Sequence, residues 1–292
     1  MKRYTPLKSG DTLGICAPSS RFDTEKLNLG IQIIESLGFK VKVPKEIFKK
    51  KRYLAGDDML RASVINTLFS DSDIDGIICA RGGFGAIRIL DYLNWEMIKQ
   101  NPKPFIGFSD CTAILLSVIS ETGIPVIHGP TVVSFVTAQK ETIDSFYKIL
   151  TGPFDGIKVT NRQVIKPGKC TGRLKGGNIA TISHLLGTKF QPDFRNCILF
   201  IEDIGEPAYK IDRMLTQMKM AGLFEKIRGV IIGTFEDCDN DEYIKEILLE
   251  IFGPYNVPIL SRLDSGHGKV NLPLYMGTDI EMDTNSARIH WI

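Results

Sequence analysis

The chain has 292 residues, is 43% hydrophobic and carries a formal net charge of +2. This length and composition predict a large core, divided between two domains. The mild charge does not favour nucleic-acid binding, and the lack of an apolar run of about 18 residues argues against attachment through a transmembrane helix. The first residues do not resemble a signal peptide, so we expect a cytoplasmic protein.

Strands and helices alternate through the first half of the chain. The expected strands cover residues 12–17, 39–43, 75–80, 104–108 and 125–127, and the expected helices cover residues 24–37, 57–69, 86–93, 110–121 and 141–150. Strands separated by helices predict right-handed βαβ units and a parallel sheet. The fold class is therefore α/β, with a first domain over residues 1–155.

The second half has a mixed pattern, and we place the crossing between domains within residues 156–169. The expected helices cover residues 178–186, 207–220 and 242–252, and the expected strands cover residues 197–202, 229–234, 273–276 and 287–292. In the second of these helices, Ile211, Met214, Leu215 and Met218 follow helical spacing and predict a buried face. A second domain is expected over residues 165–292.

The six cysteines are scattered and form no C-x-x-C pair. Because three of them lie in apolar strand-like runs, we expect reduced core residues and no disulfide framework. No His or Cys pair has the spacing of metal ligands, so neither a metal nor another cofactor is expected.

The segment 103–113 predicts a buried strand, a sharp turn at Ser109 and an apolar helix. A serine at such a turn is lifted clear of the sheet, and the N-terminus of the helix offers N–H groups to a developing negative charge. This is the geometry of a nucleophilic serine. An ordinary helix cap is the competing interpretation, and by itself it is the stronger one.

A nucleophilic serine needs a base, and the chain has four histidines. His184 lies in an apolar helix, where a packed core histidine is expected, and His290 lies in a terminal strand, where a structural role is expected. His128 ends a strand and can either line a cleft or shape a turn. His267 stands between two glycines, which indicates an unusual backbone path that presents the ring in a loop. We favour His267 as the base.

The carboxylate that orients the base should end a strand. Glu202 and Asp203 follow an apolar strand and point to opposite faces of the extended chain, so one of them can face a cleft. Asp203 and Glu206 are favoured as residues at the start of the helix near Pro207.

The turn 81–85 has two interpretations. As a dinucleotide fingerprint it is weak, because the third glycine is missing. As part of an oxyanion hole it is stronger, since a glycine at the end of the strand beside Ser109 can bring a backbone N–H to the reacting carbonyl.

These residues resemble the bacterial L,D-carboxypeptidases, a family of serine peptidases that includes muramoyltetrapeptide carboxypeptidases and microcin C immunity peptidases. The resemblance covers nearly the whole chain. It rests on GDTLGICAPSS (10–20), ARGGFGAIRIL (80–90), IGFSDCTAIL (106–115), IHGP (127–130), LKGGNIATISHLLGT (174–188), LFIEDIGEPAYKIDRML (199–215) and DSGHGKVNLPLYMG (264–277).

The resemblance implies a triad of Ser109 as nucleophile, Glu202 as orienting residue and His267 as general base. It implies an oxyanion hole from the backbone N–H groups of Asp110 and of the turn at Gly82 and Gly83, with Gly82 preferred. It also implies a homodimer, a Rossmann-like N-terminal domain carrying the nucleophile and a smaller β-rich C-terminal domain carrying the other two residues.

The family divides into two substrate classes. Murein enzymes remove the terminal D-alanine of the tetrapeptide, and immunity enzymes hydrolyse aminoacyl or peptidyl nucleotides with the help of a stacking tryptophan. Phe190 stands where that tryptophan is expected, so the murein class is favoured and a small peptide is the expected substrate. Arg81 and Arg213 are candidates to bind its carboxylate, and Gly83 and Phe190 are further candidates for contact with the substrate. A structural role is slightly favoured for Arg213, which lies on an amphipathic helix.

Two other classes stay open. An α/β-hydrolase shares the order Ser, Glu, His, but the second glycine of G-x-S-x-G is missing around Ser109. A non-enzymatic nucleotide or sugar binder would use the glycine-rich turn and would need neither Ser109 nor His267.

Overall fold

A computed structural model describes residues 5–159 and 163–292 of the chain. The chain divides into two compact units. The first unit extends to Pro153 and includes Leu272–Tyr275, and the second contains Phe154–Asn271 and Met276–Ile292. The predicted crossing between domains over 156–169 includes residues 160–162, which lie outside the described residues. Residues 1–4, on which the signal-peptide expectation partly depends, also lie outside them.

The first unit contains a six-stranded sheet in the order β12-β5-β4-β3-β1-β2, and the five strands from β5 to β2 pair in parallel. Its elements are β1 (Thr12–Cys16), α1 (Thr24–Ser36), β2 (Lys40–Lys42), η1 (Lys45–Phe48), α2 (Asp58–Ser70), β3 (Gly76–Cys79), η2 (Ala86–Tyr92), α3 (Trp95–Gln100), β4 (Phe105–Gly107), η3 (Ser109–Cys111), α4 (Thr112–Thr122), β5 (Val126–His128), η4 (Val132–Thr137), α5 (Lys140–Thr151) and β12 (Leu274–Met276), where η denotes a 3₁₀ helix.

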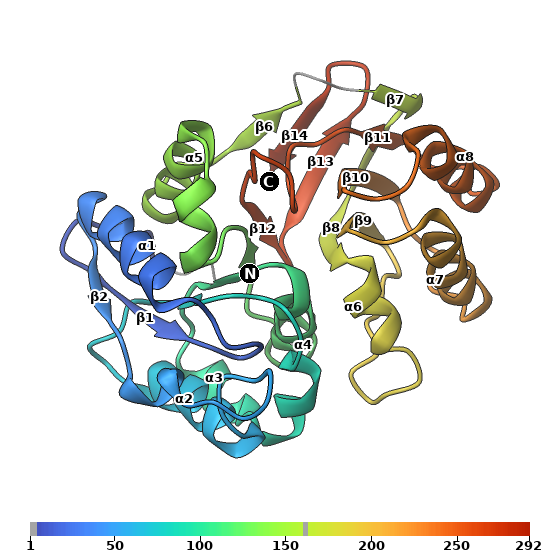
Figure 1. The fold of residues 1–292 in the computed structure, drawn as a ribbon. Coiled ribbons are helices and arrows are strands. Elements are labelled where there is room, and N and C mark those ends of the chain that lie inside the picture. Colours follow the sequence, from blue (N-terminus) through green and yellow to red (C-terminus); the bar gives the residue numbers. More distant parts are fainter. Residues whose placement is uncertain (1–4, 160–162) are drawn as a thin grey trace. The chain divides into compact units, whose positions relative to one another are not determined.

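Helices cover both faces of this sheet. Figure 1 shows α1 and α5 on one face and α2, α3 and α4 on the other. The central strands β3 and β4 are buried along their whole length, which explains their continuous apolar sequence. Because β1, β3 and β4 are parallel neighbours, the loops that follow them meet at one edge of the sheet.

The second unit contains an eight-stranded mixed sheet in the order β6-β14-β13-β8-β9-β10-β11-β7. Strands β8 to β11 pair in parallel, and antiparallel strands flank them. Its elements are β6 (Gly156–Lys158), β7 (Gln163–Lys166), β8 (Lys169–Asn178), α6 (Ile179–His184), β9 (Cys197–Ile204), α7 (Ala208–Met220), β10 (Gly229–Glu236), α8 (Asp241–Phe252), β11 (Ile259–Ser261), β13 (Asp279–Asp283) and β14 (Arg288–Trp291).

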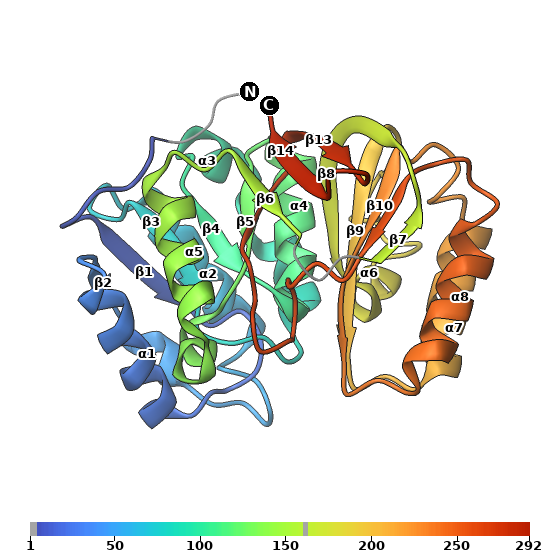
Figure 2. The same ribbon diagram turned by 90° about the horizontal axis from the view of Figure 1, so that it is seen from above.

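Helices α6, α7 and α8 pack in a row beside this sheet, as Figure 2 shows for α7 and α8. Ile211, Leu215 and Met218 form the buried face of α7, and Met214 is half-buried at its border. The parallel block brings together the carboxyl ends of four strands, as in the first unit. The predicted α/β fold class, with a parallel first sheet and a mixed second unit, is confirmed.

Several elements differ from the sequence predictions. The helix predicted over 86–93 is a 3₁₀ helix over Ala86–Tyr92. The elements that were not predicted are α3, β8, β11, β13, η1 and η4. Strand β12 belongs to the first sheet, although it lies near the end of the chain. The helices of residues 5–159 and 163–292 are all too short or too polar to cross a membrane.

Candidate active site

Ser109 lies at a sharp turn between β4 and α4. Phe108 is extended, and Ser109 itself has a φ of 61°, a left-handed conformation that is uncommon for a residue with a side chain. Strained backbone of this kind is concentrated at functional sites. Ser109 is half-exposed, whereas Phe108 and Asp110 on either side are buried. The turn therefore presents the hydroxyl at the carboxyl edge of the first sheet.

The glycine-rich turn after β3 contacts Ser109 directly. A Cβ atom on Gly82 would lie 2.8 Å from Ser109 Cβ and 3.0 Å from Ser109 Oγ, so only glycine allows this approach. The next residues are anchored from the β1 loop, where the Phe84 N–H donates to Ser20 Oγ at 3.1 Å. Gly83 has a φ of 111° and lies against Ser20. The backbone of the turn is thus placed beside the hydroxyl, as a donor to an oxyanion must be.

Glu202 and His267 form a buried pair in the second unit. His267 Nδ1 and Glu202 Oε2 are 2.6 Å apart, with the Glu202 side chain fully buried and the His267 side chain 13% exposed. A carboxylate can only accept a hydrogen bond, so the Nδ1 proton is donated to Glu202 and Nε2 is the nitrogen left to exchange a proton. The pair joins residues 65 positions apart in the chain.

The loop that carries His267 is held by Thr234 of the neighbouring strand β10 and by Asn271 further along the loop. Gly266 has a φ of 118°, and a Cβ atom there would lie 2.6 Å from Thr234 Oγ1 and 2.7 Å from Glu202 Oε2. The Gly268 N–H donates to Thr234 Oγ1 at 3.2 Å, and the Gly266 N–H donates to Asn271 Oδ1 at 3.0 Å. Glycine is required at 266 because the chain passes directly over the carboxylate.

The surroundings of His267 determine its basicity. Burial by itself lowers the pKa of His267, but the charge of Glu202, its hydrogen bond and the charge of Asp203 outweigh this effect and raise the pKa above its usual value. A raised pKa strengthens the imidazole as a proton acceptor. The site therefore favours an imidazolium stabilised by Glu202.

Asp203 has a different structural role from the one predicted. Its carboxylate accepts hydrogen bonds from Asn178 Nδ2 at 2.8 Å and from the Ala180 N–H at 3.0 Å, so it supports the start of α6 and not the helix near Pro207. The reason is that β8, which ends at Asn178, is the parallel neighbour of β9. Burial first, and the charge of Glu202 second, raise the pKa of Asp203 to about 6.

The candidate substrate-binding residues are surface side chains with partners of their own. Arg81 Nη1 donates to the Arg21 carbonyl at 3.0 Å. Arg213 lies on α7 with its guanidinium 5.4 Å from the centre of the Tyr209 ring, and Phe190 is half-buried in the loop after α6, with Lys189 Nζ 5.2 Å from its ring centre.

Of the other three histidines, one is buried and two are exposed. His184 is exposed, and the expectation that it lies in the core is wrong, because Ile179, Ile182 and Leu185 form the buried face of this short helix. His128 is fully buried at the end of β5, with its ring edge-on to Phe108. His290 is exposed on β14.

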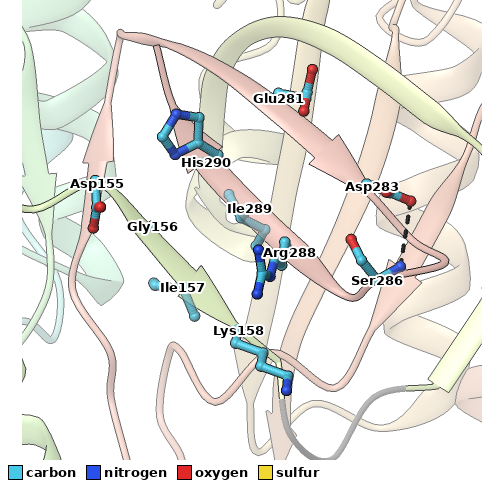
Figure 3. Close-up of a pocket in the computed structure, with 10 residues that line it drawn as sticks. All are labelled: Asp155, Gly156, Ile157, Lys158, Glu281, Asp283, Ser286, Arg288, Ile289 and His290. Atoms are coloured by element: carbon cyan, nitrogen blue, oxygen red, sulfur yellow. Dashed lines mark hydrogen bonds between the residues drawn. The ribbon is translucent and has the colours of Figure 1, made fainter.

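A pocket of about 680 Å³ lies over β6, β13 and β14 and contains neither Glu202 nor His267 (Figure 3). Charged side chains of both signs line it, among them Lys158, Glu281 and Arg288. Buried and exposed residues alternate along these strands, so the pocket is a hollow in the polar face of the outer sheet. Over residues 5–159 and 163–292, no group of three His, Cys, Asp or Glu side chains has a metal-binding arrangement.

Thr234 and Asn271, which hold the His267 loop, were missed by the sequence analysis. Thr234 follows the apolar run of β10, and polar residues at the carboxyl end of a parallel strand often line a functional site. This position could have identified Thr234 from the sequence. Asn271 had no such signal.

Ser109 belongs to the first unit and the Glu202–His267 pair to the second. Serine hydrolases use a serine at a strained strand-to-helix turn and a buried His–carboxylate pair.

Comparisons with known proteins identify the family. Residues 13–129 match the LD-carboxypeptidase N-terminal domain and residues 171–282 match the LD-carboxypeptidase C-terminal domain. The chain therefore belongs to the LD-carboxypeptidase family, whose members are hydrolases of the serine peptidase class.

Three relatives carry names that state a substrate or a role. A protein of Bacillus subtilis named a probable murein peptide carboxypeptidase is 33% identical, over 96% of this chain and 92% of its own. The murein tetrapeptide carboxypeptidase of Pseudomonas aeruginosa is 30% identical, over 96% and 94%. The microcin C7 self-immunity protein MccF of Escherichia coli is 28% identical, over 97% and 94%. A structure of MccF in complex with glutamyl sulfamoyl guanosine has a TM-score of 0.93 at 26% identity, over 99% of this chain and 98% of that one.

Proposed function

We propose that the protein is a serine L,D-carboxypeptidase that releases the terminal D-alanine from murein tetrapeptide during the recycling of wall peptides in the cytoplasm. The observation that carries the proposal is the 2.6 Å contact between His267 Nδ1 and Glu202 Oε2, which leaves Nε2 to act on a serine. The strained turn at Ser109 supports the assignment of that serine. The murein names of two relatives support the substrate class.

The proposed reaction is acyl transfer in two steps. His267 accepts the proton of Ser109, and the serine oxygen bonds to the scissile carbonyl carbon. The C–N bond breaks as the imidazolium donates its proton to the nitrogen of the leaving D-alanine. Water, activated by the same imidazole, then hydrolyses the acyl-enzyme and regenerates Ser109. Glu202 stabilises the imidazolium in both steps and is not itself protonated.

The negative charge that develops on the carbonyl oxygen needs backbone donors. We assign this role to the N–H groups of Asp110 and Gly82, because the Gly82 backbone lies against Ser109. The C-terminal carboxylate of the substrate needs a cation. Both arginines have partners, since Arg81 Nη1 donates to the Arg21 carbonyl and Arg213 lies against the Tyr209 ring. Arg81 is the better candidate because it directly precedes Gly82 in the chain.

A microcin C-type immunity activity is the second candidate. It is favoured by the MccF relationship and by the half-buried aromatic ring of Phe190 in the loop after α6. A variant of MccF with phenylalanine in place of a tryptophan has been solved in complex with adenosine monophosphate, so an aromatic ring other than tryptophan is compatible with a nucleotide in that protein. Loss of base stacking would cost about 1–3 kcal/mol per base, so this activity depends on Phe190 stacking on the base. The murein names of the relatives at 33% and 30% identity keep the murein class as the first choice.

The experiment that separates the two measures kcat/KM on three compounds. These are L-Ala-γ-D-Glu-meso-diaminopimelyl-D-Ala, its C-terminal amide and a glutamyl sulfamoyl adenylate. We expect the free tetrapeptide to be the best substrate, because the motifs are those of enzymes that cut at a free C-terminus. Equal efficiency on the amide, or greater efficiency on the adenylate, would contradict the proposal and favour the immunity activity.

A further inference from the structure

The carboxylate of Asp110 connects the two segments that surround the Ser109 hydroxyl. Asp110 follows Ser109 directly and is 7% exposed. Its Oδ2 accepts a hydrogen bond from the Ala86 N–H at 2.8 Å, across 24 positions of the chain. Ala86 begins η2 and comes immediately after the glycine-rich turn. The side chain therefore links the nucleophile turn to the turn that carries Gly82.

Arg61 holds the other side of the same peptide group. Its guanidinium projects from α2 and is buried, and Nη1 donates to the Gly85 carbonyl at 2.9 Å. The Gly85 carbonyl and the Ala86 N–H belong to one peptide bond. An anion thus binds the N–H of this peptide while a cation binds its carbonyl, and the plane of the peptide is fixed from both sides.

Arg61 is itself fixed by its neighbours. Nη2 lies 2.5 Å from Asp58 Oδ1, and Nη1 also contacts the Pro18 carbonyl in the loop after β1. Asp58 binds Arg88 of η2 in turn, with Nη2 and Oδ2 2.6 Å apart. The clamp therefore connects α2 and η2 with the loops that follow β1, β3 and β4.

A residue after a helix-starting serine is often acidic because it complements the helix dipole, and an exposed carboxylate is enough for that purpose. Asp110 is instead buried, and this burial raises the pKa of its carboxyl group. The ionised form is favoured by the groups around it, which are the Ser19 hydroxyl, the N–H groups of Ala86 and Gly85 and the charge of Arg61. An ionised carboxylate in such a place is unfavourable unless its partners are specific. The Asp110 carboxylate is directed toward the Ala86 N–H, so its burial serves to hold the Gly85–Ala86 peptide in place.

We propose that the Asp110 side chain is a positioning residue, which with Arg61 clamps the Gly85–Ala86 peptide and so keeps the Gly82 backbone at the distance from Ser109 that an oxyanion hole requires. This inference rests on the proposed function, because the position of the turn matters for turnover only if Ser109 is the nucleophile. A displacement of about 1 Å at such a site is enough to lower the rate strongly.

The test compares Asp110→Asn, Asp110→Ala and the matched control Asp75→Asn. Asp75 is a suitable control because its Oδ2 also accepts a backbone N–H from a distant segment, that of Thr12 at 2.8 Å, at the opposite end of β3. Three quantities are measured: kcat and KM for D-alanine release, the rate at which an active-serine fluorophosphonate labels Ser109, and the midpoint of thermal unfolding.

We expect Asp110→Ala to lower kcat and the labelling rate by about 10²- to 10³-fold, the effect of losing an oxyanion donor, with KM nearly unchanged. Asp110→Asn should lower them by only about 10-fold, because the amide oxygen can still accept the Ala86 N–H. Asp75→Asn should leave kcat and labelling unchanged while it lowers the unfolding midpoint. A residue that only stabilises the fold would move the midpoint and leave kcat as it is.

The inference is overturned if both Asp110 variants keep kcat and labelling within a factor of three of the wild type, or if Asp75→Asn loses as much as they do. If Asp110→Ala does not fold, the Asn variant and its control still decide between these outcomes. If the wild type is active or labelled and the Asp110 variants behave like it, the positioning role of Asp110 is contradicted and the proposed function is not. A wild type that neither releases D-alanine nor is labelled at Ser109 contradicts both this inference and the proposed function.

Discussion

The Ser109 turn and the Glu202–His267 pair are held in place by different means. At Ser109 the backbone is decisive: a φ of 61°, a glycine in contact with the side chain and a peptide clamped between two charged groups. At His267 the decisive contact is a buried charge pair, formed across 65 positions of the chain. The position of Ser109 therefore depends on backbone shape, and the position of His267 depends on electrostatics.

This difference has a consequence for substitutions. A change of shape near Ser109 should damage the rate without a change in its pH dependence, because no titrating group is altered. A change of charge near His267 should alter the rate and the pH dependence together. The three predictions that follow test this contrast, from the largest effect to the smallest.

The strongest test is a double-mutant cycle of Ser109→Ala and His267→Ala. Each single variant should lose about 10⁴- to 10⁶-fold in kcat, and the double variant should be scarcely worse than either, because nucleophile and base act as one unit. Steady-state release of D-alanine measures the rates, and thermal unfolding checks that the fold persists. Losses that add in the double variant would show that the two regions do not form one catalytic unit.

Glu202→Gln should lower kcat by about 10²- to 10⁴-fold with a smaller change in KM, because it removes the charge that stabilises the imidazolium. The same charge raises the pKa of His267, so its loss lowers that pKa, and the acidic limb of the kcat/KM profile should move to lower pH. The pH profile of the purified variant measures this shift.

Asp203→Asn serves as the control for that variant. The charge of Asp203 has a smaller influence on the pKa of His267 than the charge of Glu202. We therefore expect a smaller loss of kcat than in Glu202→Gln, and a smaller shift of the acidic limb of the kcat/KM profile toward lower pH. If Asp203→Asn proves the more damaging change, Asp203 and not Glu202 orients the base.

Gly82→Ala should lower kcat by about 10²- to 10³-fold, because its Cβ would collide with the Ser109 side chain and displace the turn from the oxyanion. The midpoint of the acidic limb of the kcat/KM profile should stay at the same pH as in the wild type, which distinguishes this variant from Glu202→Gln. A Gly82→Ala enzyme with wild-type kcat would show that the close approach of the turn has no catalytic meaning.

The sequence was informative wherever a local constraint determines the backbone. The apolar runs predicted β3 and β4 of the first sheet and β9 and β10 of the second, and the glycines on either side of His267 predicted a special path that the φ of Gly266 now explains. The turn at Ser109 was predicted from the order of strand, serine and helix. Each of these signals lies within a few residues of the feature that it describes.

Other features depend on which strands become neighbours. Asp203 supports α6 because β8 lies beside β9, and β12 completes the first sheet from a position near the end of the chain. His184 is exposed because the three apolar residues of its short helix face the core, a choice that helix periodicity over six residues does not determine.

The sequence by itself determined the α/β class, the parallel arrangement of the first sheet and the segments that carry Ser109, Glu202 and His267, because apolar periodicity and glycine placement act over a few residues. The residue pattern left Glu202 and Asp203 open, and the family resemblance favoured Glu202, which is the residue that contacts His267 in the structure. Only the tertiary structure decided that Asp203 supports α6 and that Asp110 and Arg61 bind one peptide. These contacts join residues tens of positions apart, and their partners are selected by strand order and register, which the local pattern of the chain does not encode.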